Sequence, residues 1–425
     1  MKQESKQFQL TWSESVARHQ AIIVGGGFGG LSAAKALRRQ AVDILLIDRR
    51  NHHLFQPLLY QVAGAALAPG DIAEPIRSVL ARQSNVEVLL GEVTSVDLQH
   101  RTVTVDGGSA HTYDSLVLAA GMVNHWFGND TWRAHAPGLK TLDDALEIRR
   151  RILLAYERAE WCTDAAERQR LLTFVVVGGG PTGVELAGAL KEIGAQTLRR
   201  DFRHIHPEQA RVILIEGTAQ VLSTFSGHLP ESARKQLVHI GVEVRTGLHV
   251  TAIDELGVSL GDIRIEAATV LWSAGIKAAE VGTVLGVPLD RSGRIIVAPD
   301  LSVSGRPEVM AIGDIAHFAY PDPLPGVAQV ALQMGKHVAR NLRDDGHGRP
   351  RKPFRYRNLG NMATVGRKLA VAEIAGFRFA GYLAWLIWLF VHLIALVGFR
   401  NRFVVLTQWT WNYVTNERNS RLIRD

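Results

Sequence analysis

Glycines and an acidic residue at fixed spacing form the first group of residues that could do chemistry. A short apolar run, Ala21-Ile-Ile-Val24, leads into a turn that contains Gly25, Gly27, Phe28, Gly29 and Gly30. In such a strand–turn–helix unit Gly25 permits the tight turn, Gly27 lets the backbone approach a pyrophosphate, and Gly30 lets the helix pack on the strand. Asp48 ends the next apolar run, where a carboxylate commonly accepts the ribose hydroxyls. We therefore predict a dinucleotide site.

The same pattern recurs in the middle of the chain. Phe174-Val-Val-Val177 leads into a second turn, whose candidate binding residues are Gly178, Gly180, Thr182 and Gly183. The next strand, Arg211-Val-Ile-Leu-Ile-Glu216, again ends in an acid, although an insertion with a His-rich loop makes the gap longer. Two fingerprints imply two dinucleotides. Glu216 would accept two ribose hydroxyls but repel a 2′-phosphate, and Gly217 and Thr218 supply no cation, so the second site should prefer NADH to NADPH.

Further strands end in small residues that let a backbone pass close to a cofactor. The strand that ends in Ala120-Gly121 is mirrored by one that ends in Ala274-Gly275. A later run, Val309-Met-Ala-Ile-Gly313-Asp314, ends in Gly-Asp at the start of a helix, where Asp314 could accept a sugar-like hydroxyl. These elements must position the ligands that the two glycine turns bind.

Composition limits the chemistry. A chain of 425 residues with 47% hydrophobic content should form two or three packed domains. Cys162 is the only cysteine, which excludes disulfides within the chain and any mechanism that needs a dithiol pair. The sixteen histidines show no metal-ligand spacing, so we expect no metal site. No basic and apolar signal segment precedes the first strand, so we expect an intracellular protein.

Three motifs make the chain resemble the type II NADH:quinone oxidoreductases, within the two-dinucleotide FAD/NAD(P) reductases. They are His53-Leu-Phe-Gln-Pro-Leu-Leu-Tyr60, Gly179-Gly-Pro-Thr-Gly-Val-Glu-Leu-Ala-Gly188 and Val327-Ala-Gln-Val-Ala-Leu-Gln-Met-Gly335. The resemblance implies an α/β fold of two Rossmann-like domains, with FAD at the first fingerprint and an inserted NADH domain at the second. The related disulfide reductases and sulfide:quinone oxidoreductases need paired cysteines, which this chain lacks.

The resemblance also assigns site residues. It places Phe55, Gln56, Pro57 and Leu58 near the isoalloxazine ring, Glu185 between flavin and nicotinamide, and Ala328, Gln329 and Gln333 beside the flavin and the quinone slot. From the residues alone, Glu185 could instead be an acid that the helix dipole favours, and the two glutamines an ordinary polar helix face. Several family members carry a lysine next to Gly360, but this chain has Leu359 there, so a lysine role is not carried over.

The C-terminal tail combines positive charge with tryptophan. Residues 349–425 hold 13 Lys and Arg against 3 acids, so the tail carries more than the net +7 of the whole chain, together with Trp385, Trp388, Trp409 and Trp411. This mixture favours a membrane surface over nucleic acid. The apolar run Phe379–Phe399 is long enough to span a bilayer. Two interfacial helices fit equally well, and the resemblance favours them; a buried core helix or a dimer contact is the remaining alternative.

Together these features predict five segments: a polar tail at 1–18, FAD-binding parts at 19–140 and 289–352, an NADH domain at 141–288, and a quinone- and membrane-binding region at 353–425. We expect an enzyme that passes a hydride from NADH to FAD and two electrons to a membrane quinone, without proton pumping. It would lie peripherally on the cytoplasmic face of the inner membrane and could form a homodimer. The alternatives are a ferredoxin- or rubredoxin-type reductase of a soluble acceptor and a membrane-held nucleotide-sensing flavoprotein.

Overall fold

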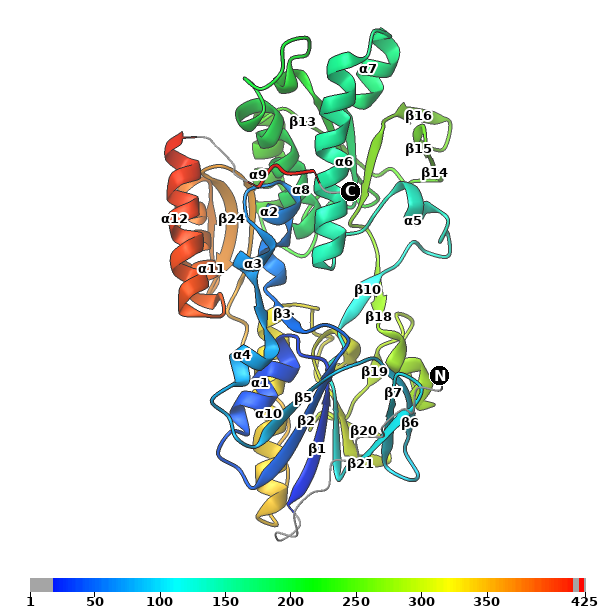
Figure 1. Cartoon of the computed structure of the whole chain (residues 1–425), viewed down its shortest axis with the longest axis vertical. Helices are drawn as coiled ribbons and strands as arrows, with labels where there is room; N and C mark the ends of the chain where they lie inside the picture. The colour runs from blue at the N-terminus through cyan, green and yellow to red at the C-terminus, as the bar shows by residue number, and fades with distance from the viewer. Residues whose placement is uncertain (1–17, 416–419, 424–425) are drawn as a thin grey trace, which may run out of the picture.

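Two mainly parallel β-sheets, each built around one glycine fingerprint, form the two ends of the molecule (Figure 1). The computed structural model describes residues 18–415 and 420–423, so the polar N-terminal stretch falls outside the described residues apart from its last residue. The predicted α/β fold with two Rossmann-like units is confirmed. Both sheets are built from continuous Val, Ile and Leu runs because each is covered on both faces.

The first sheet has six strands in the order β20-β21-β9-β1-β2-β5. All neighbours pair in parallel except β20 with β21. Its strands are β1 (His19–Val24), β2 (Val42–Asp48), β5 (Val86–Leu90), β9 (Ser115–Leu118), β20 (Ser302–Val303) and β21 (Arg306–Ala311). This sheet therefore combines strands that precede the second fingerprint with strands that follow it. We call the part with the first fingerprint the FAD unit and the part with the second the NADH unit, which is inserted in the FAD unit.

The second sheet is fully parallel, in the order β13-β12-β11-β17. Its strands are β11 (Thr173–Val177), β12 (Arg211–Glu216), β13 (Val242–Thr246) and β17 (Thr269–Trp272). The chain enters and leaves this unit through β10 (Met122–Asn124) and β18 (Ile276–Ala278), which pair with each other in antiparallel fashion. After β10, Trp126 and Ala136 pack in the core of the NADH unit, whereas Val281 and Leu285 pack in that of the FAD unit.

Helices cover these sheets. The long ones are α1 (Phe28–Ala36), α6 (Leu142–Trp161), α8 (Pro181–Glu192), α9 (Leu229–His239) and α10 (Ala328–Gly346). α6 begins after Thr141, whose hydroxyl accepts the Asp144 N–H at 3.0 Å as the N-cap of the helix. α10 lies against α1 so closely that a Cβ at Gly335 would sit 2.3 Å from the Gly29 carbonyl oxygen.

Short elements complete the two units. In the FAD unit these are β3 (His52–Leu54), α2 (Leu59–Ala63), α3 (Pro69–Ile72), β4 (Ala73–Pro75), α4 (Ile76–Leu80), β6 (Val93–Asp97), β7 (Thr102–Val105), β8 (Ser109–Thr112), β19 (Ile295–Ile296) and β22 (Ala316–His317). In the NADH unit they are α5 (Trp132–His135), α7 (Ala165–Leu171), β14 (Ala252–Asp254), β15 (Gly257–Leu260) and β16 (Ile263–Glu266).

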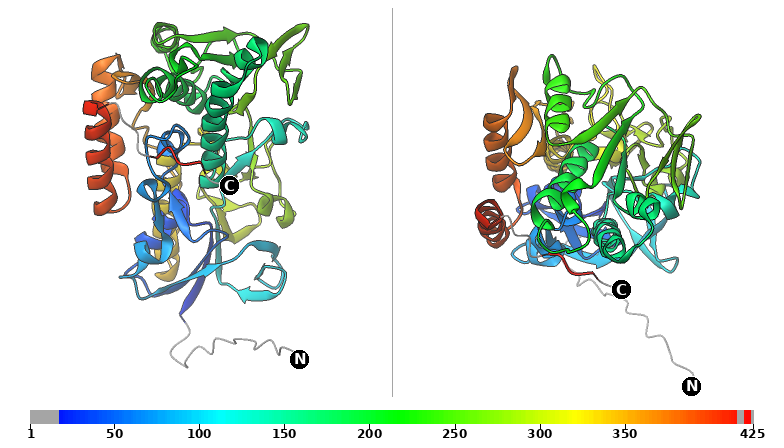
Figure 2. Two further views of the ribbon diagram at one scale, coloured as in Figure 1. Left: turned by 45° about the horizontal axis from the view of Figure 1, so that its top comes forward. Right: turned by 90° about the horizontal axis from the view of Figure 1, so that it is seen from above.

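The C-terminal region is a three-stranded sheet with two helices, seated on the NADH unit. It comprises β23 (Asn361–Gly366), β24 (Leu369–Ile374), β25 (Phe377–Ala380), α11 (Tyr382–Ala395) and α12 (Phe399–Thr415). β23 lies so close to α8 that a Cβ at Gly188 would sit 1.8 Å from the Val365 carbonyl oxygen. The two helices lie side by side on one flank of the molecule (Figures 1 and 2).

The apolar run that could have spanned a bilayer is not a single helix. Its first residues belong to β25, and α11 has 14 residues. Among the residues that the structure describes, no helix is long and apolar enough to cross a membrane.

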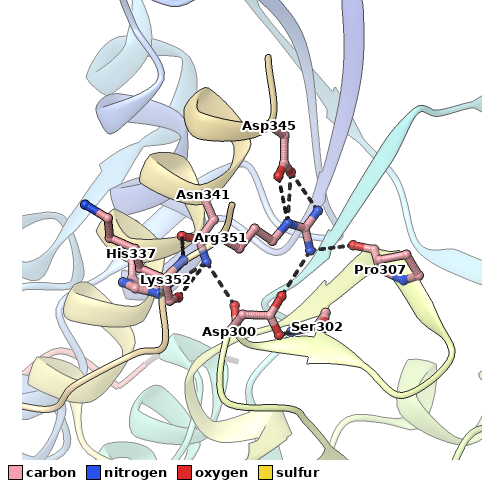
Figure 3. A network of polar contacts seen from close by, with 8 residues as sticks. All are labelled: Asp300, Ser302, Pro307, His337, Asn341, Asp345, Arg351 and Lys352. Atoms are coloured by element: carbon pink, nitrogen blue, oxygen red, sulfur yellow. Dashed lines mark hydrogen bonds and ion pairs between the residues drawn. The ribbon is translucent and has the colours of Figure 1, made fainter. Parts of the chain in front are cut away.

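A polar network fixes the chain where it leaves α10 (Figure 3). Arg351 donates to the Asp345 carboxylate at 2.7 Å and to the Pro307 carbonyl at 2.6 Å, and it contacts Asp300 at 3.4 Å. Asn341 on α10 donates to the Asp300 and Lys352 carbonyls, both at 3.2 Å. The network ties the end of α10 to the FAD sheet and so sets the path of the following segment toward the NADH unit.

Candidate functional site

The first glycine turn has the geometry that a pyrophosphate requires. Gly25 has φ +107°, a conformation that favours glycine, and a Cβ at Gly30 would sit 1.9 Å from the Gly25 carbonyl oxygen. A Cβ at Gly27 would meet nothing within 4 Å, so this side of the turn is open. Asp48 accepts the Gly26 N–H at 2.6 Å and the Arg50 N–H at 2.8 Å, which holds its carboxylate at the turn.

The second turn repeats this arrangement. Gly178 has φ +108°, a Cβ at Gly183 would sit 1.8 Å from the Gly178 carbonyl oxygen, and Gly180 faces open space. Glu216 accepts the Gly179 N–H at 2.6 Å and the Thr218 N–H at 2.7 Å. The remaining candidates lie at the same two turns. The backbone of Ala120, which precedes Gly121, lies close to Gly25. In the same way the backbone of Ala274, which precedes Gly275, lies close to Gly178. Thr182 is exposed in the first turn of α8.

Asp314 lies in a buried setting that includes a cation the sequence did not indicate. A Cβ at Gly326, just before α10 and Ala328, would sit 3.4 Å from the Asp314 carboxylate. Burial raises the pKa of Asp314, and the opposing charge of Lys140 partly offsets that rise. Burial also lowers the pKa of Lys140. Lys140 precedes the α6 cap by one residue, far from Asp314 in sequence, so only the tertiary structure pairs them.

The segment with Phe55, Gln56, Pro57 and Leu58 links the first glycine turn to the C-terminal helices. Phe55 and Leu58 are buried, whereas Gln56 and Pro57 keep some exposure. The Phe55 ring meets Phe28 edge-on at 5.9 Å and His392 of α11 at 6.3 Å between ring centroids. Nearby, His53 shares a 3.0 Å hydrogen bond with the Gly26 carbonyl, and its Nε2 is buried with no partner among the described residues.

The two glutamines of α10 both bind the backbone of the segment that contains Leu359. Gln329 donates to the Gly360 carbonyl at 2.8 Å and accepts the Leu359 N–H at 2.9 Å. Gln333 donates to the Arg357 carbonyl at 2.9 Å and accepts the Arg357 N–H at 3.0 Å. Each amide therefore acts as a clamp, and neither is merely part of a polar helix face.

Glu185 lines a pocket between α8 and the C-terminal region. We call this the Glu185 pocket; its lining includes Tyr60, Gln61, Glu185, Gln196, Thr364 and Trp388. The Glu185 carboxylate group accepts the Thr364 N–H at 3.4 Å, and burial raises its pKa to about 8. This direction is opposite to the one that a carboxylate stabilised by the helix dipole would give.

A hydrogen-bonded chain connects this pocket to α12. Trp409 donates to Gln61 at 2.8 Å, Gln61 donates to Tyr60 at 3.0 Å, and the Tyr60 and Thr364 hydroxyls are 3.0 Å apart. The sequence did not indicate these hydrogen bonds, because Tyr60 and Thr364 are 304 residues apart and Gln61 and Trp409 are 348 residues apart. No local pattern indicates such pairings.

The chain is similar to known flavoprotein oxidoreductases of the two-dinucleotide class. Residues 19–335 match the family model for pyridine nucleotide-disulphide oxidoreductases, and residues 358–416 match the model for the NDH2 C-terminal domain. The chain is 47% identical to the type II NADH:quinone oxidoreductase NdhA of Mycobacterium tuberculosis and 46% identical to Ndh of the same organism. These matches cover 96% of this chain and 89% and 91% of the two relatives.

A solved structure of NDH2 from Plasmodium falciparum in complex with NADH has the same fold. It matches with a TM-score of 0.87 at 18% identity and covers 96% of this chain and all of the other. With these matches, the chain belongs to the type II NADH:quinone oxidoreductase family. The resemblance drawn from its motifs is confirmed, and its cofactors are FAD and NADH.

The residues at the first fingerprint fit FAD. The open face of Gly27, the carboxylates of Asp48 and Asp314, and the unpartnered Nε2 of His53 are suited to a ligand that carries phosphates and many hydroxyls.

Proposed function

We propose that Phe55, Gln56, Pro57 and Leu58 flank the flavin ring, and that Gln329 and Gln333 shape the quinone slot through the segment they clamp. The protein oxidises NADH and reduces a quinone. One observation supports the assignment of roles: β23 packs on α8, and the Phe55 ring meets His392 of α11 at 6.3 Å, so the C-terminal region contacts both the helix after the second glycine turn and the segment that we assign to the flavin. When bound, FAD accepts the hydride and passes on two electrons.

The chain's own residues hold and orient the reactants in this proposal. The N–H groups at the starts of α1 and α8 bind the pyrophosphates, and Asp48 and Glu216 accept ribose hydroxyls. Asp314, opposed by Lys140, accepts a hydroxyl of the ribityl chain. Glu185 lies on the side of α8 that faces the tail, so we assign it to the protonation of the quinone.

We further propose that α11 and α12 dock on the bilayer surface. Tyr382, Leu386, Phe390 and Ile394 recur every fourth residue on α11 and are all exposed, as are Phe403 and Trp411 on α12. An exposed apolar stripe of this kind marks a surface that binds a membrane or another protein. The opposite face of α11 buries Trp385 and Trp388 in the protein core, so the helix is apolar on both sides.

The exposed Arg400 and Arg402, at the start of α12, are suited to anionic headgroups. We place this face on the cytoplasmic leaflet because NADH is a cytoplasmic substrate. A homodimer contact is the alternative use of this exposed face. We also propose that the chain passes between the FAD and NADH units at β10 and β18, and that the C-terminal region begins near residue 353.

Steady-state oxidation of NADH with a membrane quinone, with ferredoxin or rubredoxin, and with no acceptor tests the function. We expect rapid turnover with quinone only. Preferred turnover with a soluble protein acceptor would support the reductase alternative, and slow turnover with all of them would support the sensing flavoprotein. Flotation with vesicles, in high salt and in detergent, tests the docking; we expect release by detergent and not by salt, because apolar burial dominates.

A further inference from the structure

Phe127 has an exposed ring and a backbone conformation that is unusual for phenylalanine. It follows β10 in a turn from Trp126 to Asn129, which is closed by a 3.0 Å hydrogen bond from the Asn129 N–H to the Trp126 carbonyl. The two central residues, Phe127 and Gly128, have φ +52° and +87°. Positive φ at both central positions is typical of type I′ turns, in which glycine, asparagine and aspartate predominate. The turn therefore does not explain a phenylalanine at this position.

Packing within the protein does not explain the ring either. The Phe127 side chain is 61% exposed, and its ring contacts Trp272 at 6.0 Å between centroids. Trp272 is already buried, and Trp132 also packs against it. An aromatic ring that stays mostly exposed gains little from the hydrophobic effect. Because non-glycine residues in such backbone conformations cluster at ligand sites, Phe127 is a candidate ligand contact.

The ring lies on the side of the NADH site that the nicotinamide half of the dinucleotide must occupy. The Gly178 turn follows β11, and its neighbours in the sheet are β12, which ends in Glu216, and β17. Since Glu216 is on the adenosine side of the pyrophosphate, the other half of NADH extends toward the end of β17. There a Cβ at Gly178 would sit 2.7 Å from the Ala274 backbone nitrogen. At the next residue, a Cβ at Gly275 would sit 2.9 Å from Cζ of Phe127.

We propose that the Phe127 ring forms a wall of the nicotinamide subsite. The ring packs against the nicotinamide nucleotide of NADH and holds it in place for hydride transfer to the flavin. Phenylalanine offers a large apolar surface and no hydrogen-bonding group, so the contact is ring packing and not recognition of phosphate or ribose hydroxyls. The inference rests on the NADH site proposed above and adds a contact at its nicotinamide end.

Phe127→Gly separates this role from a structural one. Glycine adopts φ +52° without strain, so we expect normal FAD content and an unchanged or higher melting temperature. Arg101→Gly is the matched control, because Arg101 is exposed, has the same φ of +52° and lies in the β6–β7 turn of the FAD unit. Phe127→Tyr keeps the ring and tests rescue by a conservative change.

Calorimetric titration of the oxidised holoenzyme with NAD⁺ and with ADP-ribose, which lacks nicotinamide, measures binding without turnover. We expect Phe127→Gly to raise the Kd of NAD⁺ by about 2- to 10-fold, the scale of one aromatic contact, and to leave the Kd of ADP-ribose unchanged. Phe127→Tyr and Arg101→Gly should bind both ligands normally. In anaerobic stopped-flow mixing with NADH, the limiting rate of flavin reduction should also fall in Phe127→Gly.

Unchanged NAD⁺ binding in Phe127→Gly would overturn the inference. Equal weakening of NAD⁺ and ADP-ribose would overturn it as well, because the ring would then support the turn or the adenosine half. If Phe127→Gly does not fold, Phe127→Asn decides in the same way, since asparagine also tolerates positive φ. Glu216→Gln tests the site itself: weaker NAD⁺ binding in Glu216→Gln with normal binding in Phe127→Gly overturns this inference alone, whereas normal binding in both overturns the proposed NADH site too.

Discussion

Gln329 offers the sharpest test of how the quinone slot is built. Gln329→Leu replaces the amide with a shorter apolar side chain and removes both hydrogen bonds, at 2.8 and 2.9 Å, to the backbone of Leu359 and Gly360. Each such bond is worth about 0.5–1.5 kcal/mol net. The change therefore removes about 1–3 kcal/mol that holds the segment closed. That energy corresponds to an increase of about 5–150-fold in the open population.

We expect kcat/KM for quinone to fall within this range in Gln329→Leu, with normal FAD content and normal reduction of a small water-soluble dye. Lys336→Leu, at an exposed position on the same helix, is the control and should change neither activity. Gln333→Leu, which loses the clamp on Arg357, should act in the same direction. Equal losses of quinone and dye reduction, or loss of FAD, would refute the reasoning and assign the glutamines to flavin binding.

Four further predictions follow from the same structure. Glu216→Gln should narrow the preference for NADH over NADPH by about tenfold, ~1.4 kcal/mol, measured as the ratio of kcat/KM values; equal values in the unaltered protein would contradict the assignment. Gly188→Ala places a Cβ 1.8 Å from the Val365 carbonyl oxygen, so it should lower the free energy of unfolding by about 1–3 kcal/mol. It should also impair quinone reduction more than dye reduction. An unchanged melting temperature would argue against this packing of β23 on α8. Burial raises the pKa of Glu185 to about 8, so quinone reduction should fall as pH rises through 8, and Glu185→Gln should lack that decline. The protonated carboxyl's contribution to the free energy of unfolding should be complete below its ordinary pKa and be lost as pH rises through the raised pKa. Phe390→Glu, at a side chain 64% exposed on α11, should weaken vesicle binding in flotation with dye reduction intact; unchanged flotation would move the docking surface elsewhere.

The sequence alone was sufficient for the elements whose signal is local. The glycine turns, the acids that follow them and the parallel strands are specified by residues within a few tens of positions, because a glycine that must adopt positive φ or allow close packing cannot be replaced without strain. The polar helix after Thr141 is specified in the same way by its cap. The motif resemblance to the family was likewise readable from short contiguous stretches.

Contacts between distant segments were decided only by the tertiary structure. Burial of Glu185 depends on β23 packing on α8, and the chain from Trp409 to Tyr60 depends on α12 returning to the first unit. The tail was expected to bind a membrane surface, yet two of its tryptophans, Trp388 and Trp409, belong to the main core. Hydropathy reports that a side chain is apolar and not which apolar partner it meets, so the division of α11 between core and exposed face could not be read from the sequence.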